Sequence, residues 1–157
     1  MRKRIVGPDS GGVAASVAPW LDLEHLAEVE LSSEDALHPI ESALHPDASG
    51  GWRAADPGEQ TLRLRFAEPR QLRRIRLVFE ERDLSRTQEF VLRWSGPDGS
   101  TYRDIVRQQY TFSPPDTVRE VEDYTVQLEG VATLELRIVP NIGGGTARAS
   151  LAEWAIG

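Results

Sequence analysis

The sequence predicts an all-β protein built as an antiparallel β-sandwich. The first observation is an alternation of apolar and polar residues that recurs along the second half of the chain, which is typical of strands with one buried face. The second is a turn signal about every ten residues, a spacing found in sandwiches and barrels rather than in βαβ folds. The third is a single stretch that suits a short helix.

The 157 residues divide into an N-terminal arm, residues 1–22, and a sandwich domain, residues 23–157. The arm mixes Gly, Ser, Pro and small apolar residues without a sustained period, so we expect it to be only partly ordered. Trp20 is expected to hold its end against the domain. The length fits one domain with a core of its own.

The domain is expected to begin with a strand over residues 26–31, although the glutamates in this segment would also suit a short helix. Pro39 then precedes residues 40–44, and proline in the first turn predicts the short helix of the fold. Pro46 ends that helix, because proline cannot continue it.

Alternation then predicts at least four half-buried strands, at residues 62–66, 75–79, 90–94 and 134–138. Turns are predicted between strands at Glu68-Pro69, Asp98-Gly99, residues 113–116, residues 129–130 and residues 143–145. Asp-Gly is a strong hairpin signal, so residues 102–110 should return beside residues 90–94. Residues 149–156 are expected to form the final strand.

Composition excludes several classes of function. The chain has no cysteine, which excludes disulfides and thiolate chemistry. A net charge of -7 and a pI near 5.0 argue against a nucleic-acid partner, because such binding needs many clustered cations. No apolar run reaches the length of about 20 residues that membrane insertion requires. Residues 7–12 interrupt any signal-peptide core, so we expect a cytoplasmic protein.

Three segments carry a resemblance to a known family: residues 40–44 with Asp47 and Gly51-Trp52, residues 90–95 with residues 98–102, and residues 134–138 with residues 150–154. They are similar to the short helix and following loop, the Asp-Gly hairpin and the Ser-Leu-x-Glu ending of the discoidin family. This family, also called coagulation factor 5/8 type C domains, has a galactose-binding-like jelly-roll fold. The likeness covers about residues 24–157.

The resemblance implies a non-catalytic binding module that recognises a carbohydrate or a similar polar ligand with loops at one end of the sandwich. The alternative is an intracellular protein–protein interaction domain, since family members serve both purposes and fold does not choose between them. The sequence has no G-x-S-x-G turn, no cysteine nucleophile and no H-E-x-x-H motif, so we do not expect an enzyme.

Carbohydrate-binding relatives carry an arginine and an amide in the loop before the hairpin. The matching loop here offers Arg82, Asp83, Arg86 and Gln88, which could form charge-assisted hydrogen bonds with sugar hydroxyls. The family's usual Asn-Gly is absent from it, and a solvated charged turn is the alternative.

A second candidate pair is Gln109 and Tyr110, at the end of a strand, where an amide beside an aromatic ring could bind a ring-shaped ligand. A packed pair of core aromatics is the alternative interpretation of this segment.

The resemblance also implies a structural calcium ion held by Asp47, Ser49 and Glu153, since calcium is bound by loop carbonyls and carboxylates. The sequence departs from the family pattern here, because residues 48–51 replace the usual Asp-Gly and Asn-rich stretch. A metal-free turn is therefore the alternative. His38 and His45 fit no standard spacing for a transition-metal site.

Overall fold

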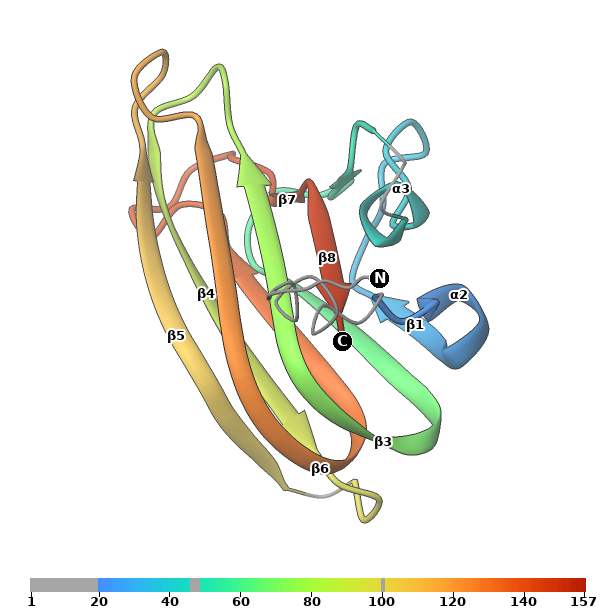
Figure 1. The fold of residues 1–157 in the computed structure, drawn as a ribbon. Helices are drawn as coiled ribbons and strands as arrows, with labels where there is room; N and C mark the ends of the chain where they lie inside the picture. Colours follow the sequence, from blue (N-terminus) through green and yellow to red (C-terminus); the bar gives the residue numbers. More distant parts are fainter. Residues whose placement is uncertain (1–19, 46–48, 100) are drawn as a thin grey trace, which may run out of the picture.

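Two long strands, β3 (Gln60–Glu80) and β6 (Arg119–Val139), organise the fold. The computed structural model describes residues 20–45, 49–99 and 101–157. In it β3 and β6 pair antiparallel over most of their length. Their register shifts at several points between Arg65 and Arg74, and both strands curve there (Figure 1). Irregular pairing of this kind bends a strand pair, so each strand contributes to two layers.

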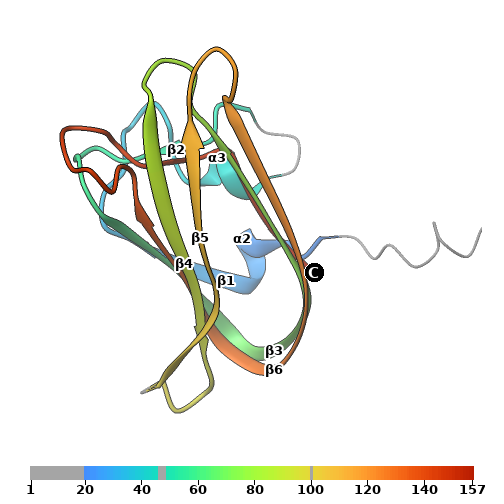
Figure 2. The same ribbon diagram turned by 90° about the vertical axis from the view of Figure 1, so that its left-hand side faces the viewer.

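The six-stranded sheet has the order β1-β3-β6-β4-β5, with β8 paired to β3. The first layer contains β1, the first half of β3, the second half of β6, β4 and β5. The second layer contains the second half of β3, the first half of β6 and β8. A separate two-stranded sheet joins β2 and β7. The remaining elements are α2 (Leu23–Leu26), β1 (Ala27–Leu31), α3 (Glu41–Leu44), β2 (Trp52–Arg53), β4 (Arg86–Ser95), β5 (Tyr102–Phe112), β7 (Ser150–Leu151) and β8 (Glu153–Ile156). Figure 2 shows β4 and β5 in front, with β3 and β6 curving below them.

The core lies between the layers. Phe79 of the second half of β3 packs on Phe90 of β4, with ring centroids 5.1 Å apart. Inward residues of the alternating segments, such as Leu64 and Leu136, are fully buried. Each buried side chain of this size contributes about 1.5–3 kcal/mol through removal of apolar surface from water. The apolar positions that predicted the strands therefore supply the force that holds the two layers together.

The predicted strand over residues 26–31 is confirmed as β1, and the predicted helix over residues 40–44 is confirmed as α3. The hairpin is also confirmed, because Phe90 pairs with Gln108 and Trp94 with Arg103. The fold has a second one-turn helix, α2, directly before β1, so the alternative of a short helix holds for the start of this segment.

Three details of the prediction differ from the structure. Glu68-Pro69 is no turn between strands, because β3 continues through it at the bend. Residues 129–130 likewise lie inside β6, where Gly130 takes a positive φ of 69°. The predicted final strand divides at Ala152 into β7 and β8, which pair with different partners.

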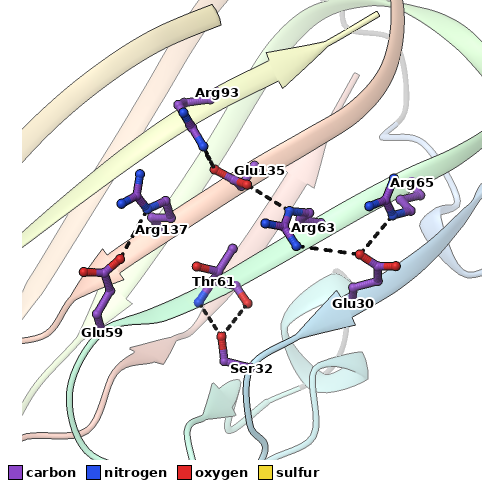
Figure 3. A network of polar contacts seen from close by, with 9 residues as sticks. All are labelled: Glu30, Ser32, Glu59, Thr61, Arg63, Arg65, Arg93, Glu135 and Arg137. Atoms are coloured by element: carbon purple, nitrogen blue, oxygen red, sulfur yellow. Dashed lines mark hydrogen bonds and ion pairs between the residues drawn. The ribbon is translucent and has the colours of Figure 1, made fainter. Parts of the chain in front are cut away.

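The outer face of the first layer carries a network of charges (Figure 3). At its centre Glu135 points outward from β6 yet is only 1% exposed, because arginine side chains from neighbouring strands cover it. Arg63 Nε lies 2.9 Å from one carboxylate oxygen, and Arg93 Nη2 lies 2.6 Å from the other. The hydrogen bond with Glu135 raises the pKa of Arg63. This network satisfies its own charges, so we assign it a structural role.

The described end of the predicted arm lies along the C-terminal strand. The guanidinium of Arg74 sits 3.6 Å from the centre of the Trp20 ring, and the Leu21 amide donates a 2.8 Å hydrogen bond to the carbonyl of Ile156. Residues 1–19 lie outside the described residues, so their order stays a prediction. Among the described helices, none has the length and apolarity to cross a membrane.

Candidate functional site

A polar hollow lies where the connection from β3 to β4 meets the small β2–β7 sheet. We call it the loop-end cleft. It has a volume of about 210 Å³. Its lining comprises His38, Gly50, Trp52, Arg53, Glu80, Glu81, Arg82, Asp83, Arg148, Ser150, Leu151 and Ala152. In Figure 1, α3 and β7 lie near the end of the sandwich at which β3 terminates.

Backbone hydrogen bonds fix the floor of the loop-end cleft. Trp52 pairs with Leu151 and Arg53 with Ser150, and both apolar residues are buried. The Ala152 amide donates a 2.7 Å hydrogen bond to the carbonyl of Val78, which ties the small sheet to β3. The side chains that point away from the core on this sheet are therefore held on a rigid support.

Arg82 and Asp83, both predicted as ligand-binding residues, line the loop-end cleft. The Arg82 side chain is 65% exposed and lies 3.6 Å from a carboxylate oxygen of Glu80. The carboxylate of Asp83 is exposed. Both side chains can thus reach a molecule in the cleft, and their role in binding stays a prediction.

Glu81 shapes the loop that carries these two residues. One of its carboxylate oxygens accepts hydrogen bonds from the backbone amides of Asp83 (3.1 Å) and Leu84 (3.2 Å). The other lies 2.7 Å from Nε of Arg86. Burial opposes ionisation of Glu81, but these hydrogen bonds outweigh it and hold the pKa of Glu81 below its ordinary value. The loop is therefore ordered around an ionised carboxylate.

Arg86, which the sequence placed among the ligand-binding residues, lies between the two layers. Its side chain is 0% exposed. It donates to Glu81, to the carbonyl of Pro140 at 2.8 Å and to Gln88 at 3.4 Å, and it lies 4.9 Å from the centre of the Phe112 ring. In this conformation the guanidinium is not accessible to a ligand, because none of its surface is exposed.

Gln88 is the second predicted residue that is buried. Its amide nitrogen donates a 2.9 Å hydrogen bond to Glu120, a carboxyl that is only 2% exposed. Burial raises the pKa of Glu120 to about 8, and the neighbouring Glu122 adds to this rise. Gln88 thus bridges the layers through a carboxyl that stays protonated at neutral pH.

The protonated carboxyl of Glu120 makes the free energy of unfolding depend on pH. The unfolded carboxyl loses its proton near its ordinary value of 4.5, whereas the folded carboxyl keeps it until about 8. The stability that Glu120 contributes is therefore fully present below pH 4.5 and is lost as pH rises to about 8. We expect a loss of about 1 kcal/mol per pH unit from this group between roughly pH 5 and 8.

Urea denaturation at several pH values checks this expectation. Glu120→Gln keeps an acceptor for Gln88 and has no proton to lose, so its stability should change less across the same pH interval. Parallel pH profiles for the two proteins would contradict the assignment.

Gln109 and Tyr110 point to opposite faces of β5, as neighbours on a strand do. Gln109 is exposed, whereas Tyr110 is half-buried, donates a 3.1 Å hydrogen bond to the carbonyl of Arg119 and contacts the edge of the Phe112 ring. Neither residue lines the loop-end cleft. The structure therefore does not bring this pair together with Arg82 and Asp83.

The predicted calcium ligands are only partly described. Asp47 lies outside the described residues, and Ser49 is exposed. Glu153 lies 3.4 Å from Nε of Arg76, whose positive charge would compete with a cation. The described part of the chain holds no group of three acidic, histidine or cysteine side chains arranged for a metal. A calcium site would depend on Asp47 and stays a prediction.

Sequence reasoning missed Arg53 and Arg148, which line the cleft from the small sheet. It weighed His38 only as a metal ligand, whereas this ring lies in the cleft with Nδ1 3.4 Å from Asp35. Arg53 lies on a two-residue strand and Arg148 just before one, and strands this short show no periodicity. The position of Arg53 beside the family-like Trp52 was the only available signal.

No protein-family model matches the chain. Solved structures nevertheless share its fold. The module CpGH89CBM32-5 from Clostridium perfringens, in complex with GalNAc-β-1,3-galactose, matches with a TM-score of 0.62 and 15% identity over 88% of this chain and 99% of that chain. A pectin-binding carbohydrate-binding module matches with a TM-score of 0.57 and 18% identity over 83% of this chain and 89% of that chain.

A third neighbour is a different kind of protein. Reduced XRCC1 bound to the catalytic domain of DNA polymerase β matches with a TM-score of 0.58 and 15% identity over 84% of this chain and 95% of that chain. Structural similarity at sequence identities this low shows a shared fold only. The function has to be inferred from the site. The chain has the discoidin-like, galactose-binding jelly-roll fold that its sequence resembles.

Proposed function

We propose that this chain is a non-catalytic carbohydrate-binding module whose ligand lies in the loop-end cleft. The observation that carries the proposal is the meeting of Arg82 and Asp83, both exposed, with the polar side chains of the small sheet around one hollow. Arginine donates and aspartate accepts hydrogen bonds, and sugar hydroxyls do both. The fold is shared with a module solved in complex with a disaccharide, which supports this choice of ligand.

The apolar part of such a site would be aliphatic. Trp52 lines the cleft but is only 1% exposed, so its ring is covered. Leu37 precedes the lining residue His38 and is 84% exposed, and Leu84 follows Asp83 and is 45% exposed. Neither leucine lines the cleft, so only a ligand that extends beyond the hollow would contact them. Aliphatic contact offers less than an aromatic platform, so we expect weak affinity.

A catalytic role is not part of the proposal. A general acid needs a carboxyl that holds its proton near neutral pH. The lowered pKa of Glu81 keeps that residue ionised, and its oxygens are already used by Arg86 and by the backbone. Among the residues that the structure describes, the carboxyl with a strongly raised pKa is that of Glu120, which is buried between the layers and does not line the cleft.

Arg82→Ala and Asp83→Ala should each weaken carbohydrate binding about 10- to 100-fold, because each removes charge-assisted hydrogen bonds worth about 1.5–3 kcal/mol. Glycan-array screening of the purified chain identifies a ligand, and calorimetric titration of that glycan measures the change in affinity. Arg107→Ala is the matched control, since Arg107 is 59% exposed on β5 and does not line the cleft.

Unchanged affinity in both cleft variants would place the ligand elsewhere. Absence of any glycan signal, with and without added calcium, would contradict the proposal and favour a protein partner. Binding that a chelator abolishes would support a calcium site at Asp47.

A further inference from the structure

Two arginines lie at the side of the loop-end cleft formed by the small sheet: Arg53 in β2, and Arg148 two residues before β7. Arg53 and Arg148 are both exposed and both line the loop-end cleft. Neither side chain makes a hydrogen bond or ion pair with a residue that the structure describes, although Arg148 is close enough to Asp35 to contribute to its lowered pKa. The carboxylate of Asp35 is itself occupied by the Leu37 amide at 3.0 Å and by His38.

The register of the small sheet brings the two arginines together. Arg53 lies opposite Ser150, and the Ala54 amide donates a 2.9 Å hydrogen bond to the carbonyl of Ala149. Both alanines are 0% exposed and face the core, so Arg53 and Arg148 share the opposite, outer face. Both side chains also line the same cleft of about 210 Å³, so their two guanidinium groups can converge on one anion.

Two of the three acidic residues that line the cleft are paired with other arginines. Glu81 balances the buried Arg86, as described above. Glu80 lies 3.6 Å from Arg82 and 3.7 Å from Arg119. Asp83 is the one acidic lining residue whose side chain makes no ion pair with a described residue. One side of the cleft is thus neutralised, while the side formed by the small sheet keeps two positive charges.

This local positive charge stands out in a chain whose overall net charge is -7. An acidic protein repels anionic ligands at long range, so an anion binds only where cations are concentrated in a concave site. Two unpaired arginines also match the geometry of planar anions, because each guanidinium presents a fork of donors. Neutral sugars would leave both charges unmatched.

We infer that the ligand of the loop-end cleft is an acidic carbohydrate whose anionic group, a carboxylate or a sulfate ester, binds between Arg53 and Arg148. This inference rests on the proposed function and narrows it to one class of sugar. The anion contacts the two guanidinium groups, while Arg82 and Asp83 bind the hydroxyls of the same or an adjoining ring.

Titration calorimetry with paired probes tests the inference. The probes are an oligogalacturonate and its methyl ester, and a sulfated galacto-oligosaccharide and its desulfated form. We expect one acidic probe to bind at least about tenfold more tightly than its neutral partner, and to weaken as salt is raised. The acidic probe that binds identifies the anionic group.

The double variant Arg53→Gln, Arg148→Gln should weaken binding of the acidic probe about 10- to 100-fold and weaken binding of its neutral partner much less, so the preference for the acidic probe should disappear. Arg107→Gln makes a single charge change of the same kind outside the cleft and should have little effect. An amide-proton NMR spectrum confirms that the variants fold, which we expect because both replaced side chains are exposed.

Equal affinity for acidic and neutral probes, or equal affinity of the double variant and the parent for the acidic probe, would overturn the inference and leave the proposed function standing. Binding of neutral glycans alone has the same meaning. Failure of the chain to bind any glycan would overturn both.

Discussion

Glu81→Ala should lower the free energy of unfolding by about 3–5 kcal/mol, the usual cost of leaving a buried charge without its partner. Arg86 has a side chain that is 0% exposed, and Glu81 supplies the only carboxylate paired with it among the described residues. The variant also loses the oxygen that accepts the amides of Asp83 and Leu84. Urea denaturation measures the change.

Glu80→Ala is the matched control for this experiment. The ion-pair partners of Glu80 are Arg82 and Arg119, whose side chains are 65% and 51% exposed. Exposed pairs contribute about 0–1 kcal/mol, so the control should be close to the parent. Similar losses in the two variants would show that the buried position of Arg86 does not decide the effect.

Gly51→Ala should destabilise the fold by about 2–5 kcal/mol. A Cβ atom at this position would lie 2.5 Å from the carbonyl oxygen of Leu151 and 2.8 Å from the α-carbon of Ala152, and both are backbone atoms that cannot rotate away. Gly51 also has a φ of +63°, which costs a side-chain-bearing residue about 1–2 kcal/mol. Overpacking against the backbone adds about 1–3 kcal/mol. Thermal and urea denaturation measure the sum.

The adjacent glycine separates these two contributions. Gly50 has a φ of +92°, but a Cβ there meets no described atom within 4 Å. Gly50→Ala should therefore show only the backbone cost, about 1–2 kcal/mol. If Gly50→Ala proved as damaging as Gly51→Ala, the close approach of Gly51 to β7 would not be the cause.

The alternation of apolar and polar residues predicted the strands of both layers well, because it indicates directly which side chains are buried on folding. Leu62, Leu64 and Phe79 were assigned to the core from their period of two, and all are buried. The bend in β3 was not predictable in this way. Glu68-Pro69 has the composition of a turn, yet pairing with β6 carries the strand through it with shifts of register.

Of the four predicted residues of the loop before the hairpin, two line the cleft and two do not. Arg82 and Asp83 were predicted from the resemblance of their loop to the one that carries an arginine and an amide in carbohydrate-binding relatives, and both are exposed. Arg86 has the same guanidinium group as Arg82, yet Arg86 and Gln88 are buried, with Glu81 and Glu120 as their partners inside the fold. The sequence cannot reveal such partners, since they depend on contacts between strands that are distant along the chain.

The shared long strands have a consequence for how the molecule unfolds. Because β3 and β6 run through both layers, neither layer can open without breaking pairs that belong to the other. Pairs such as Gln60 with Ile138 join parts of the chain that are far apart in sequence, and closing such contacts makes folding slow. Amide hydrogens in both halves of β3 should therefore exchange with solvent only through global unfolding, at one common rate, while those of the edge strands β1 and β5 exchange through local fraying.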